Sequence, residues 1–247
     1  AMDTIGKSQK KKNAVATVLM IILFTILAIL IILPIYAIFM ASFHPGNFLL
    51  QYGLNLDPDF ANMTLSNYVL LFTGDHDYWI WFGNSLLLTV LTVVLTLVIS
   101  SFVAYGFAAY DFKGKNFFFV IVLIILSIPF EVIMLPLYKQ ISTWGMMDSY
   151  VAVVLPFLAH ASTIFFFRQY LLGLPKSLIE AGRIDGATEY GIFFKLIVPI
   201  MKPAFSAMAI LNGMNAWNNY MWPLLVIRSS SKYTLTIGLN TLINPYG

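Results

Sequence analysis

The sequence contains no cysteine, and only 10% of its 247 residues are charged. Without cysteine, the chain can form neither a disulfide framework nor a thiolate metal site. The three histidines, His44, His76 and His160, are far apart and show no HExxH or other metal-ligand spacing, so we predict no metal site. Soluble domains carry about 25% charged residues. With 60% apolar residues and a mean hydropathy of +0.83, this chain is predicted to be an integral membrane protein.

Catalytic and nucleotide-binding motifs are also missing from the sequence. No GxSxG or P-loop pattern occurs, because the segment Gly114, Lys115, Asn116 lacks the upstream glycine and the following Ser or Thr. No long basic stripe with interleaved aromatic residues supports nucleic-acid binding. An intramembrane enzyme is disfavoured, since the apolar segments hold no paired aspartates, Ser–His set or metal ligands. We predict no catalytic residues and no cofactor in this chain, so the energy for active transport must come from a partner.

Five apolar segments alternate with polar ones, and each is predicted to be a membrane-spanning helix. The predicted fold class is therefore all-α, a polytopic helical bundle in a lipid bilayer. The first segment is far longer than the apolar core of a signal peptide, which is about 7 to 15 residues, and we interpret it as an anchored span. Residues 1–13 form a polar N-terminal tail, and residues 14–247 form the transmembrane domain. The spans are expected at about residues 14–43, 79–110, 116–138, 150–167 and 203–227.

The positions of lysine and arginine orient these spans. The segments assigned to one side, which include the N-terminal tail, hold eleven of these residues, whereas the segments assigned to the other side hold three. Residues 44–78 carry four aspartates and no lysine or arginine. Positive residues concentrate on the cytoplasmic side of membrane proteins. We therefore expect the N-terminus in the cytoplasm, together with the polar stretch between the fourth and fifth spans.

That polar stretch, residues 175–203, is the most informative part of the chain. Ser177 is followed three residues later by Glu180, the spacing of a capping box, and Pro175 cannot continue a preceding helix. This pattern predicts a helix over about residues 177–190.

Two glycines within the predicted helix call for an explanation. Gly182 and Gly186 are four residues apart and would lie on one face. Each glycine costs about 1 kcal/mol relative to alanine in a helix interior, so close approach by another surface would explain the pair. The segment is therefore either a solvated helix between two spans or a docking helix for a soluble partner.

The segment EAGRIDGA, followed by Leu196, Val198 and Pro199, resembles the EAA loop of ABC importer permeases. The spacing of that loop is kept throughout, although the third residue of its Glu-Ala-Ala pattern is Gly182 here. Further motifs resemble the carbohydrate branch of the family, specifically the shorter permease subunit of maltose-type importers. These motifs are IPFEVIMLPLY, FFRQYLLGLPKSLIEAGRIDGA, NAWNNYMWPLL and YTLTIGL. The resemblance covers roughly Asn84 to the C-terminus.

The resemblance implies a type I ABC importer permease fold with six spans, so a sixth span is expected beyond the five visible ones. It also implies a multi-pass protein of the cytoplasmic (inner) membrane of a prokaryote. The implied partners are a homologous longer permease, two ATPase subunits that bind ATP and Mg²⁺, and an extracytoplasmic solute-binding protein. The polar helix would then be a coupling helix seated on an ATPase. Its implied coupling residues are Glu180, Ala181, Gly182, Arg183, Asp185, Gly186 and Pro199. Glu180 would cap the helix and pair with the ATPase, and Pro199 would set the turn back into the membrane.

The translocation pathway is less sharply marked. Glu131 is the only acid within a predicted span, where a carboxylate costs about 2.5–3.5 kcal/mol on insertion scales. It either faces a cavity or partner helix, or is held structurally near the interface between two prolines. Asn212, Asn215 and Asn219 follow i, i+3, i+7 spacing on one helix face, with Asn218, Trp217 and Trp222 nearby. These amides either line a sugar pathway, with the aromatic rings stacking on sugar, or form hydrogen bonds between helices.

The resulting prediction is a non-enzymatic permease subunit that passes a carbohydrate, in the first place an oligosaccharide, across the membrane. A polyol or a glycerol phosphate ester is the alternative solute. A non-transporting membrane scaffold or sensor component is the alternative class.

Overall fold

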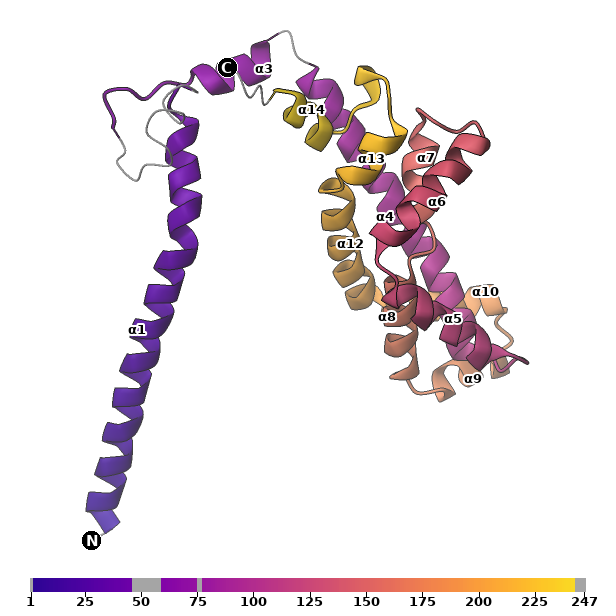
Figure 1. Cartoon of the computed structure of the whole chain (residues 1–247). Coiled ribbons are helices and arrows are strands. Elements are labelled where there is room, and N and C mark those ends of the chain that lie inside the picture. Colours follow the sequence, from indigo (N-terminus) through magenta and orange to yellow (C-terminus); the bar gives the residue numbers. More distant parts are fainter. Residues whose placement is uncertain (1, 46–58, 75–76, 243–247) are drawn as a thin grey trace. The chain divides into compact units, whose positions relative to one another are not determined.

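The computed structural model describes residues 2–45, 59–74 and 77–242, and within these ranges all regular structure is helical (Figure 1). The chain divides into two units, residues 1–76 with 244–247, and residues 77–243. Each unit is described by itself. The C-terminal residues 243–247, after which the sixth span is expected, lie outside the described residues.

The first unit contains one long apolar helix and a short one. Helix α1 spans Met2–Ser42, so the predicted polar tail is part of the same helix as the first span, and Pro34 lies inside it without ending it. Helix α3 spans Ser66–Thr73. The side-chain amide of Asn67 in α3 donates to the carbonyl oxygens of Ser42 (3.0 Å) and His44 (2.7 Å). These bonds satisfy carbonyl groups at the C-terminal end of α1, which its own hydrogen bonds leave free.

The second unit is built around α4, an uninterrupted helix over Tyr78–Ala109. Its most extensive contacts are with α8 and α12. Ser100 and Ala104 of α4 are fully buried. Small side chains let helices approach closely where lipid supplies no hydrophobic driving force.

The other spans are bent rather than straight. Among the described residues, two helices, α1 over Ala16–Ser42 and α4, are long and apolar enough to cross a membrane, and up to five spans result if each bent pair counts as one. Helix α5 (Lys115–Ser127) meets α6 (Phe130–Thr143) at 102°, so the third predicted span is not one straight helix. Pro129 sits at this bend as the N-cap of α6, whereas Pro136 lies inside α6 without ending it.

The predicted fourth and fifth spans are each made of more than one helix. The fourth consists of α7 (Tyr150–Val154), η1 (Leu155–Phe157) and, after a 41° bend, α8 (Ala161–Leu172). The fifth is α12 (Lys202–Trp217) followed by the separate α13 (Met221–Val226). Beyond it lie η3 (Ser230–Lys232) and α14 (Leu235–Leu242).

Buried side chains form separate clusters toward the two ends of α4. One cluster joins α4, α8 and α12 to the segment after α9 and includes the fully buried Phe167 and Met201. The other joins α6, α7 and α13, and at its centre Trp222 donates from Nε1 to the carbonyl oxygen of Ala152 at 2.9 Å. Figure 1 shows α9 and α10 near one end of α4 and α14 near the other.

Candidate functional site

The predicted coupling helix is shorter than its sequence pattern suggested. Helix α9 spans Ser177–Ile184, and α10 spans Glu189–Ile192, so the expected continuous helix to residue 190 is wrong. Gly186 ends α9 because it takes the left-handed conformation, with φ of +75°, and its amide donates to the carbonyl oxygen of Arg183 at 3.1 Å. A glycine in this conformation is a common helix C-terminal signal. Gly186 therefore does not share a helix face with Gly182.

The capping box predicted at the start of α9 does not form. The N-cap is Lys176, with no side-chain cap hydrogen bond, and Ser177 is already helical. The capping occurs instead at α10, where Thr188 accepts a hydrogen bond from the amide of Gly191 at 3.1 Å. This bond supports a second helix start only four residues after α9 ends.

Close packing explains Gly182, but the neighbouring surface belongs to the same chain. A Cβ atom at this position would lie 3.0 Å from Cγ1 and 3.3 Å from Cδ1 of Ile192 in α10. Ile192 is itself buried. Gly182 thus allows α10 to fold back against α9, whereas the sequence interpretation expected an external partner there.

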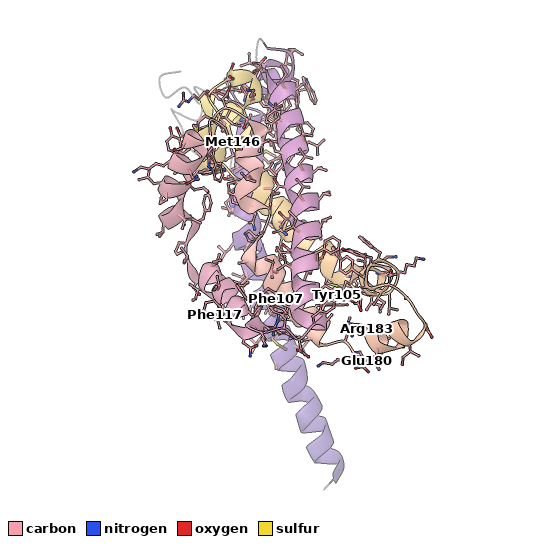
Figure 2. The ribbon with its side chains drawn as sticks, turned by 90° about the vertical axis from the view of Figure 1, so that its right-hand side faces the viewer. Tyr105, Phe107, Phe117, Met146, Glu180 and Arg183 are labelled. Atoms are coloured by element: carbon pink, nitrogen blue, oxygen red, sulfur yellow. The ribbon has the colours of Figure 1, made fainter. Side chains whose placement is uncertain are left out.

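A charged network ties these two short helices to the end of α4. Arg183 donates from Nε to Oε1 of Glu189 at 2.6 Å and from Nη2 to Oε2 at 3.3 Å. The same carboxylate accepts hydrogen bonds from the hydroxyls of Tyr110 (2.6 Å) and Tyr105 (3.4 Å). The hydrogen bond to Glu189 raises the pKa of Arg183, which therefore stays charged. We call Arg183, Glu189, Tyr105 and Tyr110 the brace; Figure 2 shows Arg183 and Glu180 at the same end of the unit as Tyr105.

The remaining coupling candidates face outward. Glu180, Ala181 and Asp185 are exposed, and none forms a side-chain hydrogen bond with another described residue. Between them, Ile184 has 85% of its side chain exposed, the largest value among the large apolar residues that the structure describes. Pro199 lies in α11 (Val198–Ile200), directly before a 74° bend into α12. The sequence analysis did not count Ile184 or the brace partners of Arg183 among the coupling candidates, although an isolated isoleucine among charged residues was a visible signal.

The pathway candidates separate into different environments. Asn212 is buried and bonds to the hydroxyl of Thr163 in α8. Its Nδ2 donates to that hydroxyl at 3.1 Å, and its Oδ1 accepts from the same hydroxyl at 3.4 Å. Asn212 lines a cavity between α4, α12 and the α7–α8 bend, together with Asn215 and Asn219. Asn218 instead bonds the carbonyl oxygen of Met214 in its own helix at 2.8 Å.

Three other pathway candidates lie elsewhere. The ring of Trp217 packs edge-on against Phe82, 5.6 Å between centroids. Trp222 is part of the buried cluster described above. Glu131 lies in the first turn of α6, exposed in this unit and away from the cavity. A carboxylate in the first turn of a helix is stabilised by the helix dipole.

Comparison with known proteins identifies the bundle. The sequence model of the family described as binding-protein-dependent transport system inner membrane component matches residues 97–246. The arabinooligosaccharides transport system permease protein AraQ of Halalkalibacterium halodurans is 48% identical over 239 residues, 97% of this chain and 86% of the relative. The sn-glycerol-3-phosphate transport system permease protein UgpE of Brucella suis is 32% identical over 231 residues, 90% of this chain and 80% of the relative.

A solved structure confirms the predicted fold class. A chain of a bacterial ABC transporter involved in the import of the acidic polysaccharide alginate matches with a TM-score of 0.83 at 24% identity, covering 96% of this chain and 82% of that one. The bent helix pairs are thus those of a type I importer permease. The resemblance inferred from the EAA-like segment is confirmed, and the chain belongs to the family of binding-protein-dependent transport system inner membrane components.

Proposed function

We propose that this chain is a membrane subunit of an ABC importer that passes an oligosaccharide across the cytoplasmic membrane. In this assembly it pairs with a homologous longer permease and receives its substrate from an extracytoplasmic binding protein. Two separate ATPase subunits hold ATP and Mg²⁺ and supply the energy. The similarity to an arabinooligosaccharide permease over 97% of the chain supports this substrate class.

One observation carries the proposed coupling role: the exposure of Ile184 in α9. Its side chain is 85% exposed beside Arg183 and Asp185, in a segment too charged to face lipid. Tyr190 at the start of α10 is 73% exposed. A contiguous apolar patch on a water-facing surface marks a site of protein association, whereas single exposed apolar residues are common. We infer that α9 docks in a groove of an ATPase subunit, with Ile184 as its apolar anchor and with Glu180 and Asp185 beside it.

The brace would transmit a movement of the docked α9 to the rest of the bundle. Arg183 in α9 is joined through the Glu189 carboxylate to the tyrosines at the end of α4, and Gly182 packs against Ile192 in α10. A displacement of α9 therefore moves α4 and α10 with it. Closure of the ATPase dimer would shift the bundle between two states in this way, as a ligand shifts a two-state equilibrium toward the form it binds better.

The candidate pathway favours a neutral solute over a phosphate ester. The cavity beside Asn215 and Asn219 is lined by hydroxyl, amide, imidazole and apolar groups, and none of the described residues that line it is a lysine or arginine. Proteins bind phosphate groups with arginine, lysine or groups of backbone amides. The identity to the glycerol phosphate permease is also lower than that to the arabinooligosaccharide permease, 32% against 48%.

The orientation follows from the charge distribution. The basic N-terminal tail and the segment containing α9 carry most of the lysine and arginine residues. Positive residues favour the cytoplasmic side. Both would therefore face the compartment in which the ATPase works.

The docking role is tested by Ile184→Asp, with Ile184→Leu as the matched control. We expect the aspartate variant to lose the copurifying ATPase subunits and the uptake of arabinotriose in cells, while the leucine variant retains both. Membrane insertion of each variant, measured by immunoblot of the membrane fraction, shows that the chain itself is intact. Retention of ATPase and uptake by Ile184→Asp would reject the docking role. Loss of uptake with normal ATPase binding would show that Ile184 acts in a step of the transport cycle other than ATPase docking.

A further inference from the structure

The cavity in the second unit is too large for an isolated buried water. Its volume is about 150 Å³, and it lies among α4, α12, α13 and the two sides of the α7–α8 bend. A single water needs about 10–15 Å³ of such volume, so this space holds either several waters or a small ligand. Its walls include Asn215 and Asn219, which the sequence analysis had singled out for their spacing.

Part of the polar wall is fixed by bonds within the protein. Thr96 donates to the carbonyl oxygen of Phe157 at 2.8 Å, and Asn212 is bonded to Thr163. Ser85 accepts a hydrogen bond from the amide of Leu235 at 2.8 Å. These three groups hold the surrounding segments together and give the cavity a defined shape.

Another part of the polar wall keeps its hydrogen-bonding capacity. The side chains of Asn215, Asn219 and Thr92 form no hydrogen bond with another residue in the described part of the chain. His160 uses Nδ1 for Ser162 at 2.7 Å, which leaves Nε2 for another group. Two amides, a hydroxyl and an imidazole nitrogen thus offer both donors and acceptors.

Apolar side chains complete the wall. Phe157, Leu88 and Val153 line the cavity beside the amides, and no lining residue carries a formal charge with histidine neutral. A sugar ring presents hydroxyl groups at its edge and C–H groups on its faces. A neutral wall that combines amides with an aromatic ring suits such a ligand, because small-molecule sites are mostly apolar with a few placed polar groups.

We propose that this cavity is a sugar subsite within this subunit, which holds one ring of the transported oligosaccharide during its passage. Asn215, Asn219 and His160 bond its hydroxyl groups, and Phe157 packs against the ring. The inference rests on the proposed import of oligosaccharides. Because Val153 and Phe157 precede the 41° bend and His160 lies within it as the N-cap of α8, a change in that bend opens or closes the site. Release of the ring is thereby linked to movement of the helices.

The absence of cysteine from the chain allows a direct test. Asn215→Cys and Asn219→Cys each introduce the only thiol of this subunit. We would react the complete importer in nanodiscs with methyl methanethiosulfonate and follow modification of this chain by mass spectrometry. The reaction would be compared without sugar and with the binding protein, arabinotriose and a non-hydrolysable ATP analogue. We expect the sugar to slow modification about tenfold, as for a site that is about 90% occupied. Lys113→Cys, in the exposed α4–α5 turn, should react equally in both conditions.

Two results would overturn the proposal. If both thiols react but arabinotriose does not slow them, the cavity holds water only. If neither reacts while Lys113→Cys does, another segment or lipid fills the space. Uptake of arabinotriose by the unsubstituted importer is measured separately, so failure of the proposed substrate class is distinguishable from failure of the subsite.

A second measurement uses uptake rather than labelling. Asn215→Ala should lower maximal arabinotriose uptake several-fold, whereas Met214→Ala should not. The methionine lies on the same helix, is 59% exposed, does not line the cavity, and loses the same number of heavy atoms. Equal uptake by the two variants would overturn the proposal.

Discussion

The two ends of the second unit are both held by a carboxylate, but in different ways. At the α9 end, the Glu189 carboxylate accepts hydrogen bonds from the side chains of Arg183, Tyr105 and Tyr110. At the α14 end, Asp148 accepts from the backbone amides of Arg228 (2.9 Å) and Ser229 (3.0 Å). Side-chain links can re-form after a helix shifts, whereas backbone links fix one loop to another. We therefore propose that the α9 end is the movable end of this unit and the α14 end the fixed one.

Further contacts strengthen the fixed end. The hydroxyl of Ser229 and the ammonium group of Lys232 also donate to the Asp148 carboxylate, and the amide of Asp148 donates to the carbonyl oxygen of Val226 at 2.7 Å. Asp148 itself has a φ of +57°, which is uncommon for a residue with a side chain. The fully buried Trp222 packs directly behind this loop. By contrast, the α9 end presents exposed apolar side chains.

The largest predicted effect is on the fixed end. Trp222→Ala removes a fully buried indole and its hydrogen bond to Ala152, and such truncations cost about 3–5 kcal/mol. We expect a marked fall in the thermal unfolding temperature of the purified importer. Trp144→Ala, at a residue with 54% exposure, should change that temperature little. Equal effects of the two substitutions would show that the buried cluster does not stabilise this end.

Asp148→Asn tests the polar part of the same end. Hydrogen bonds from Ser229, Arg228 and Lys232 hold the pKa of Asp148 well below its usual range. A depressed pKa in the folded protein contributes stability at pH values above the unfolded pKa of about 3.9, and that contribution is lost as the pH falls toward the folded value. We expect the variant to be less stable at neutral pH and less sensitive to acid below about pH 4. Parallel pH profiles of unfolding temperature would contradict this role.

Glu189→Gln tests the movable end. The substitution keeps the shape of the side chain but removes the charge that joins Arg183 to the tyrosines. The ion pair is about 40% exposed, so we expect at most about 1 kcal/mol of stability to be lost. Uptake should nevertheless fall several-fold at unchanged ATPase binding, because α9 would no longer move with α4. Lys115→Gln, which breaks the other ion pair near this end, is the control. Normal uptake by Glu189→Gln would show that the brace is not needed for transport.

Gly186→Ala should have the smallest effect on coupling to the ATPase. Alanine in the left-handed conformation costs roughly 1–2 kcal/mol, here at a φ of +75°. We expect slightly weaker ATPase copurification, with asparagine at this position better tolerated because it adopts this conformation more readily. If alanine is tolerated as well as asparagine, Gly186 is not needed as the end of α9.

The sequence was most informative where a single residue type decides the local outcome. Pro129 is the N-cap of α6 at the break between α5 and α6, but the 102° angle of that break depends on packing. Gly182 and Gly186 were recognised as costly in a helix, but their reasons differ: one lets Ile192 approach, and the other ends the helix. The i, i+3, i+7 asparagines were placed on one face and all three line the cavity, yet only the tertiary structure shows that the amide of Asn212 is bonded to Thr163, unlike those of the other two.

By itself, the sequence determined that this chain is an all-helical membrane protein with a charged segment unlike its surroundings, because hydropathy and charge act locally and add along the chain. Only the tertiary structure decided that Arg183 pairs with Glu189, that Asp148 binds the loop at Ser229, and that Asn215 and Asn219 share a cavity with His160. These pairings depend on bends between helices. Such bends are set by contacts between residues far apart in sequence, which no local pattern encodes.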